Sequence, residues 1–190
     1  MPPEELLVRS LAWLSFAGYC AATAARLTAV QSTSGILPLP TRQDAACTAI
    51  DERRWRFARA AWTFGCVLYL SHVACAYHFV HHWSHVAAIE FTARRTYQTI
   101  GIDWGGGLYV NHFYLAVWVV DVILWWRGGA LSPARRNRRV EAALQFFFAF
   151  MWFNATVVFG TGPIRWVGAA ATMLLAALAI PRMPRKNAPT

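Results

Sequence analysis

The chain has 190 residues and a formal net charge of +9, and 57% of its residues are hydrophobic while only 14% are charged. One soluble domain of this length cannot bury so much apolar surface, so the composition excludes an ordinary soluble fold. The apolar residues form long blocks that are nearly free of acids and bases, and the charges are crowded between the blocks. This distribution is typical of a multi-pass membrane protein.

Five apolar blocks follow one another along the chain, over residues 6–27, 60–82, 108–126, 140–160 and 164–181. Each approaches or exceeds the roughly 20 residues that cross a hydrocarbon core as a helix. None alternates as the strands of a membrane barrel do, and open strands would leave backbone groups unpaired in lipid. The sequence therefore predicts an all-α integral membrane helical bundle with about five transmembrane helices. We expect one membrane domain over residues 1–190, with an outer loop at 83–107.

The first block is the one with an alternative interpretation, because a cleaved signal peptide is also apolar. Glu4 and Glu5 precede the single Arg9, whereas a secretory signal normally opens with positive charge alone. We therefore expect a retained helix. Arg26 lies at the inner margin of this block, and we expect its side chain to extend to the membrane interface.

The basic residues indicate the orientation. With the N-terminus outside, fourteen of the 18 Lys and Arg residues fall in cytoplasmic segments, which predicts an N-out, C-in topology. The fourteen are Arg26, Arg42, Arg53, Arg54, Arg56, Arg59, Arg127, Arg135, Arg136, Arg138, Arg139, Arg182, Arg185 and Lys186. Topology accounts for these residues without a nucleic-acid partner, so we expect the lipid bilayer as the partner. The preference for Arg over Lys favours a bacterial source, and hence the cell (inner) membrane.

Histidines gather at the outer ends of the second and third spans. Of the six histidines, His78, His81, His82 and His85 occupy one short stretch and His112 opens the third span. On a continuing helix, the first four are spaced by three or four residues and share one face. Since His78 and His112 lie at a similar depth, we expect antiparallel helices to bring these two rings together.

Imidazoles at this spacing suit a transition metal ion such as Zn, Cu or Fe. The expected metal ligands are His78, His81, His82, His85 and His112, with Glu90 and Asp103 as nearby carboxylates. Haem is the other cofactor that the pattern admits, held by His78 or His82 together with His112. We therefore predict that the protein binds a metal ion or haem and acts in redox chemistry or metal handling.

The segment His78-Phe79-Val80-His81-His82 resembles the HxxHH box of membrane-bound fatty-acid desaturases and hydroxylases. The di-iron centre of that family takes about eight histidines from several such boxes. This chain has six histidines and one box, so the resemblance covers five residues and does not extend to the family.

Two other interpretations of the histidines stay open at the level of sequence. Imidazole rings are stable at the level of the lipid headgroups. The histidines are therefore also consistent with a non-catalytic structural or accessory subunit that assembles with other membrane subunits. They also titrate near neutral pH, which is consistent with a pH-sensing role.

Two polar residues fall inside the predicted spans. Asp121 lies in the third span and His72 in the second. A buried carboxylate requires a partner or a proton, so we expect these two residues to pair. Two roles stay open for them: a proton relay, or one interhelical hydrogen bond, with Tyr69, Tyr114 or Asn154 as its partner.

The outer loop combines an amphipathic stretch with a glycine run. Residues 86–99 either extend the second helix or lie along the membrane surface. Gly105, Gly106 and Gly107 then predict a hinge through which the chain re-enters the bilayer. Small residues at a spacing of four, such as Gly18 with Ala22, favour close helix packing.

Overall fold

The computed structural model describes residues 2–33 and 42–180, and helices are the only regular secondary structure within those ranges. The helices are α1 (Pro3–Thr33), α2 (Arg42–Cys75), η1 (Ala76–Val80), α3 (His85–Ile100), α4 (Gly107–Gly128), α5 (Ser132–Arg135), α6 (Arg138–Phe153), η2 (Asn154–Val158) and α7 (Pro163–Ala179). The π-helical turns η1 and η2 directly continue α2 and α6, so each pair forms one rod.

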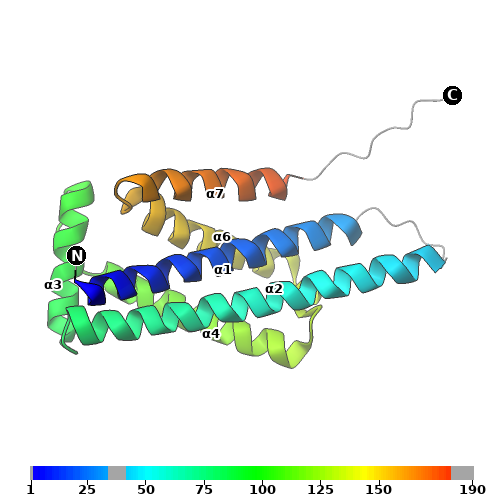
Figure 1. Ribbon diagram of the computed structural model, residues 1–190, viewed down its shortest axis with the longest axis horizontal. Coiled ribbons are helices and arrows are strands. Elements are labelled where there is room, and N and C mark those ends of the chain that lie inside the picture. Colours follow the sequence, from blue (N-terminus) through cyan, green and yellow to red (C-terminus); the bar gives the residue numbers. More distant parts are fainter. Residues whose placement is uncertain (1, 34–41, 181–190) are drawn as a thin grey trace.

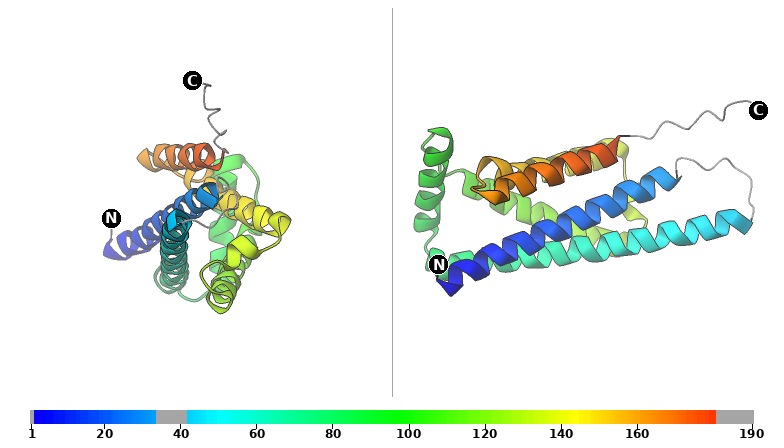
Figure 2. Two further views of the ribbon diagram at one scale, coloured as in Figure 1. Left: turned by 90° about the vertical axis from the view of Figure 1, so that its right-hand side faces the viewer. Right: turned by 45° about the horizontal axis from the view of Figure 1, so that its top comes forward.

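The long helices run back and forth along one axis (Figure 1). Helices α1, α2, α4, α6 and α7 share this direction, whereas α3 lies across one end of the bundle, as both views of Figure 2 also show. The N-terminus lies at the same end as α3. We call this end the outer end, because the sequence assigns its loops to the outside, and the opposite end the inner end.

Four helices of the described chain are long and apolar enough to cross a membrane, over Pro3–Val30, Asp51–Val80, Gly107–Gly128 and Arg138–Val158. They contain the first four predicted blocks almost entirely. The fifth block corresponds to α7, whose 17 residues lie at the lower limit of a spanning helix. The predicted all-α helical bundle is thus confirmed, with four helices that could span a membrane where about five were predicted. Residue 181 and the basic residues Arg182, Arg185 and Lys186 lie outside the described residues.

The outward faces of the long helices are apolar. On α2, Phe57, Phe64, Val67 and Leu70 are each at least half exposed, with exposed fractions of 50–57%. Monomeric soluble proteins rarely present contiguous apolar surface of this kind. Lipid is therefore the medium that suits this surface.

The centre of the bundle is built from aromatic rings. Trp62 of α2, Trp118 of α4 and Phe148 of α6 are fully buried. The ring centroid of Trp62 lies 5.2 Å from that of Trp118 and 4.7 Å from that of Phe148, within the range of favourable aromatic pairs. Large rings from three helices therefore fill the centre of the bundle.

Helices α1 and α2 approach each other closely because both carry glycine at the crossing. A Cβ atom placed on Gly18 would lie 3.0 Å from the Cα atom of Gly65. The hydroxyl of Ser15 donates a hydrogen bond of 2.8 Å to the carbonyl of Gly65 across the same contact. The expected close packing at Gly18 is confirmed.

Candidate functional site

The second span ends in a π-helical turn followed by a sharp break. The amide of His81 donates to the carbonyl of Ala76, and His82 and Trp83 then adopt left-handed backbone conformations with φ of 49° and 59°. The hydroxyl of Ser84 accepts a hydrogen bond from the amide of Ala87 and so caps the new helix α3. The expectation of one continuing helix from His78 to His85 is therefore wrong.

This break separates three of the histidines. His78 is exposed and its Nδ1 accepts a hydrogen bond of 3.3 Å from the indole N–H of Trp83. His81 packs against Phe91, with ring centroids 5.3 Å apart, and burial together with the neighbouring His82 lowers its pKa. His82 is exposed. These three rings do not converge on a common point.

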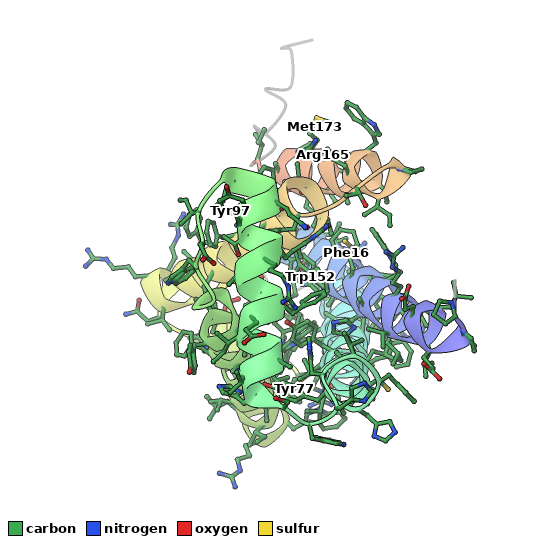
Figure 3. The ribbon with its side chains drawn as sticks, turned by 90° about the vertical axis from the view of Figure 1, so that its left-hand side faces the viewer. Phe16, Tyr77, Tyr97, Trp152, Arg165 and Met173 are labelled. Carbon is green, nitrogen blue, oxygen red and sulfur yellow. The ribbon has the colours of Figure 1, made fainter. Side chains whose placement is uncertain are left out.

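The other two histidines of the predicted metal set, His85 and His112, do come together, and two tyrosines connect them. The hydroxyl of Tyr77 lies 3.1 Å from Nδ1 of His85 and 3.3 Å from Nε2 of His112. The hydroxyl of Tyr109 lies 3.4 Å from Nε2 of His85. We call Tyr77, His85, Tyr109 and His112 the His–Tyr cluster. Its members come from η1, α3 and α4, at the outer end where Tyr77 lies beside α3 (Figure 3).

Hydrogen-bond chemistry makes this cluster one connected unit. A phenolic hydroxyl donates one proton and accepts others, and a neutral imidazole donates from one nitrogen and accepts at the other. The hydrogen bonds therefore form one line from Tyr109 through His85 and Tyr77 to His112, in which each donor can face an acceptor. The two imidazole rings lie 6.2 Å apart between centroids, inclined by 30°. Nδ1 of His85 and Nε2 of His112 both face the hydroxyl of Tyr77.

The outer carboxylates lie apart from the cluster. Glu90 is exposed and lies 3.9 Å from Arg94 in an ion pair along α3. Asp103 is exposed and makes no hydrogen bond or ion pair with a histidine in the described ranges. Accordingly, no group of three or more His, Cys, Asp or Glu side chains among the described residues is arranged to hold a metal ion. The structure brings together His85 and His112 from the predicted metal set, and not His78, His81, His82, Glu90 or Asp103.

The segment after the break forms a separate helix, which is one of the two alternatives that the sequence left open. Helix α3 lies across the bundle end, and Arg95 on it donates to the carbonyl of Phe159 at 2.8 Å. Helix α3 ends at Gly101, which has a φ of 76° that favours glycine. The three glycines Gly105–Gly107 then lead into α4. Residues 86–99 therefore lie along the surface and do not extend the second span.

His72 and Asp121 do not pair, contrary to the expectation from sequence. Nδ1 of His72 lies 2.8 Å from the carbonyl oxygen of Val8, near the outer end. Asp121 lies closer to the inner end of α4, where its carboxylate is 2.6 Å from Arg136. The two residues have different depths, because His72 lies eight residues before the outer end of its span at Val80 and Asp121 lies fourteen residues beyond the outer end of its span at Gly107.

Asp121 belongs to a buried network of four charged side chains. Arg136 bridges Asp121 and Glu141, the latter at 3.2 Å, and Glu141 also pairs with Arg26. The network joins α1, α4 and α6 with the linker that follows α5. Two arginines and two carboxylates give it no net charge, which reduces the cost of burial.

Arg26 is buried instead of extending to the interface. Its exposed fraction is 5%, and its guanidinium lies 5.3 Å from the ring centroid of Trp62 and 4.8 Å from that of Trp125. Cation–π contacts and the ion pair with Glu141 replace the water that Arg26 gives up. Sequence reasoning missed the roles of Arg26, Arg136 and Glu141. The available signal was that Arg26 and Glu141 lie at the inner margins of apolar blocks and that Arg136 lies in the short connection between two blocks.

No protein-family model, curated protein or solved structure matches this chain.

Proposed function

We propose that the protein binds a transition metal ion at the His–Tyr cluster, with His85 and His112 as nitrogen ligands and the oxygen of Tyr77 as the third ligand. The observation that supports this is the convergence of Nδ1 of His85 and Nε2 of His112 on one hydroxyl, at 3.1 and 3.3 Å. Metal–nitrogen bonds are about 2.0–2.1 Å long for zinc. Two ligands bound at that length to a tetrahedral ion lie about 3.3 Å apart, close to the 3.1 and 3.3 Å that separate the hydroxyl from the two nitrogens.

The chemistry of the ligands favours Zn, Cu or Fe. Imidazole suits each of these ions, and loss of the phenolic proton would add one negative charge. His85 is exposed, so a coordination position remains open toward the outer surface. An open position permits exchange with a solute or a redox partner, which is what metal handling or redox chemistry requires.

An ion fits this geometry better than haem does. In a bis-histidine haem the iron porphyrin lies between the two ligand nitrogens. Here the hydroxyl of Tyr77 lies at that point and is hydrogen-bonded to both rings. Haem would require Tyr77 to leave, whereas a metal ion can keep it as a ligand.

The arginine distribution further supports an N-out, C-in orientation, and the preference for Arg over Lys favours the cell membrane of a bacterium. The cluster then faces the outside. A structural or accessory subunit with interfacial histidines is the competing function, and it predicts that no ion is bound.

The test is elemental analysis of protein purified in mild detergent, with and without added zinc, copper or iron. We expect about one ion per chain in the wild type and in His78→Ala, a matched control on the adjacent turn that lacks convergent partners. His85→Ala and His112→Ala should lose the ion, and Tyr77→Phe should weaken its binding. Circular dichroism checks that each variant folds.

Two results would overturn the proposal. The first is folded wild-type protein that contains no metal and binds none of the three ions. The second is loss of the ion in His78→Ala to the same extent as in His112→Ala. Either result would favour the interfacial interpretation.

A further inference from the structure

A second polar feature of the outer end is a cleft between α1, α3 and the start of α7. Its volume is about 190 Å³, which is below the roughly 300–1,000 Å³ of pockets for drug-sized ligands. Both charged residues that line it are arginines, Arg9 of α1 and Arg95 of α3, and no carboxylate lines it. The cleft therefore suits a headgroup-sized anion more than a whole cofactor.

The two arginines are held differently. Arg95 donates one of its five N–H groups to the carbonyl of Phe159 at 2.8 Å, which anchors the guanidinium at the rim. Arg9 is exposed and makes no hydrogen bond or ion pair with any other residue that the structure describes. Two positive charges thus line one cleft that contains no carboxylate. An anion bound between the two guanidinium groups would offset their mutual repulsion.

The rest of the cleft is mainly apolar. Trp13 and Phe16 from α1 and Trp152 from α6 form part of its wall, and the ring centroids of Phe16 and Trp152 are 5.1 Å apart. Figure 3 shows Phe16 and Trp152 together beside α3, away from Tyr77. One part of a ligand in this cleft would therefore contact the arginines and another part the aromatic rings. The cleft is separate from the His–Tyr cluster.

The shape of the cleft follows from the end of the fourth span. The turn η2 gives way to a loop at Gly160, where a Cβ atom would lie 1.8 Å from the carbonyl oxygen of Thr156. Only glycine permits this close turn, after which the chain reverses into α7. The reversal leaves the loop beside α1 and opens the space into which Arg9 and Arg95 extend.

We propose that this cleft binds the phosphate of an anionic amphiphile, with Arg9 and Arg95 on the phosphate oxygens and the first part of an acyl chain against Trp13, Phe16 and Trp152. Guanidinium groups match phosphate geometry, and their carbon stems lie well along apolar surface. The position at the end of the spans places the charge at headgroup level. An anionic phospholipid has both parts, whereas free phosphate has the charge alone.

The test is native mass spectrometry of the full chain in mild detergent with three probes: phosphatidylglycerol, phosphatidylcholine and inorganic phosphate. We expect one phosphatidylglycerol to bind roughly tenfold more tightly than phosphatidylcholine, and inorganic phosphate to compete only weakly. Arg9→Gln and Arg95→Gln should each reduce binding of phosphatidylglycerol by roughly tenfold, the size expected for a lost charged hydrogen bond.

Arg165→Gln is the matched control. Arg165 also lies at the outer end and donates to a backbone carbonyl, that of Val157 at 2.8 Å, but it does not line the cleft. Its replacement should leave lipid binding unchanged. If Arg95→Gln does not fold because it loses the bond to Phe159, Arg9→Gln decides the matter, since Arg9 has no such bond.

Three outcomes would overturn the proposal. Equal affinity for the two lipids would show that the net negative charge of the lipid is not recognised, since phosphatidylcholine also carries a phosphate but has no net charge. Inorganic phosphate binding as tightly as the lipid would show that the apolar wall contributes nothing. An equal loss of binding in Arg165→Gln and Arg9→Gln would show only a general effect of positive charge.

Discussion

The four side chains of the buried charged network depend on one another for partners. Asp121 is 2% exposed and has Arg136 as its ion-pair partner, while Glu141 is shared between Arg136 and Arg26. Removing one member leaves a charge of the opposite sign without compensation. In a low-dielectric interior, the uncompensated charge costs more than the lost ion pair contributed.

Asp121→Leu should therefore destabilise the protein strongly, by about 3–5 kcal/mol, because it leaves Arg136 short of an acceptor. Asp121→Asn should cost less, since the amide oxygen still accepts a hydrogen bond. The double variant Asp121→Leu/Arg136→Leu should be more stable than Asp121→Leu alone, because Arg26 and Glu141 remain as a balanced pair. Thermal unfolding in detergent measures the differences, with Asp103→Asn as an exposed control. Equal stability of the Asn and Leu variants would contradict this account.

Backbone strain at the break before α3 is a second effect at the residue scale. His82 has a φ of 49°, a conformation that a residue with a Cβ atom adopts only at a cost of about 1–2 kcal/mol. His82→Gly should therefore be about 1 kcal/mol more stable than His82→Ala, since both variants lack the imidazole and only alanine retains the strain. Denaturant or thermal unfolding of the two variants provides the comparison. If alanine proves as stable as glycine, the break does not require a left-handed residue.

At the scale of elements, the contact between α1 and α2 depends on the absence of side chains at the crossing. A Cβ atom on Gly18 would lie 3.1 Å from the carbonyl oxygen of Ala61 as well as 3.0 Å from Gly65. Both atoms belong to the backbone, so neither can rotate away. The helices would have to separate to admit a larger residue.

Gly18→Val should consequently destabilise the bundle by about 1–3 kcal/mol, the usual cost of overpacking. Ala17→Val is the matched control, because Ala17 is the adjacent residue on α1 and is exposed. The control should be close to neutral in a detergent-based melting experiment. A Gly18→Val variant as stable as the control would mean that α1 and α2 pack less closely than the structure indicates.

For the whole molecule, the charged ends of the bundle determine how it lies in a membrane. The outer end carries Arg9, Arg94, Arg95 and Arg165, whereas the inner end carries the larger share of the arginines. A reporter fused after Arg139 should therefore be cytoplasmic and one fused after Asp103 should be outside. Alkaline phosphatase and green fluorescent protein fusions test both positions. A cytoplasmic reporter after Asp103 would invert the topology and place the His–Tyr cluster on the cytoplasmic side.

Hydropathy alone determined the class of fold and the approximate positions of the long helices. The physical reason is that lipid imposes a length and a composition on each span, and both can be counted along the chain. Counting could not predict the π-helical turn at Ala76–Val80 or the early start of α2 at Arg42. Both depend on how the helix packs and caps at its ends.

Sequence also indicated that the histidines lie near one end, and that Asp121 needs a partner. Which groups meet was decided only by tertiary structure. The break at His82 and Trp83 turns α3 across the bundle and joins His85 to His112 through Tyr77, leaving His78 apart. Arg136 reaches Asp121 because the linker after α5 folds back against α4 and α6. Composition locates charges and apolar stretches, but which residues pair depends on where the helices break and how they then pack, and composition does not locate those breaks.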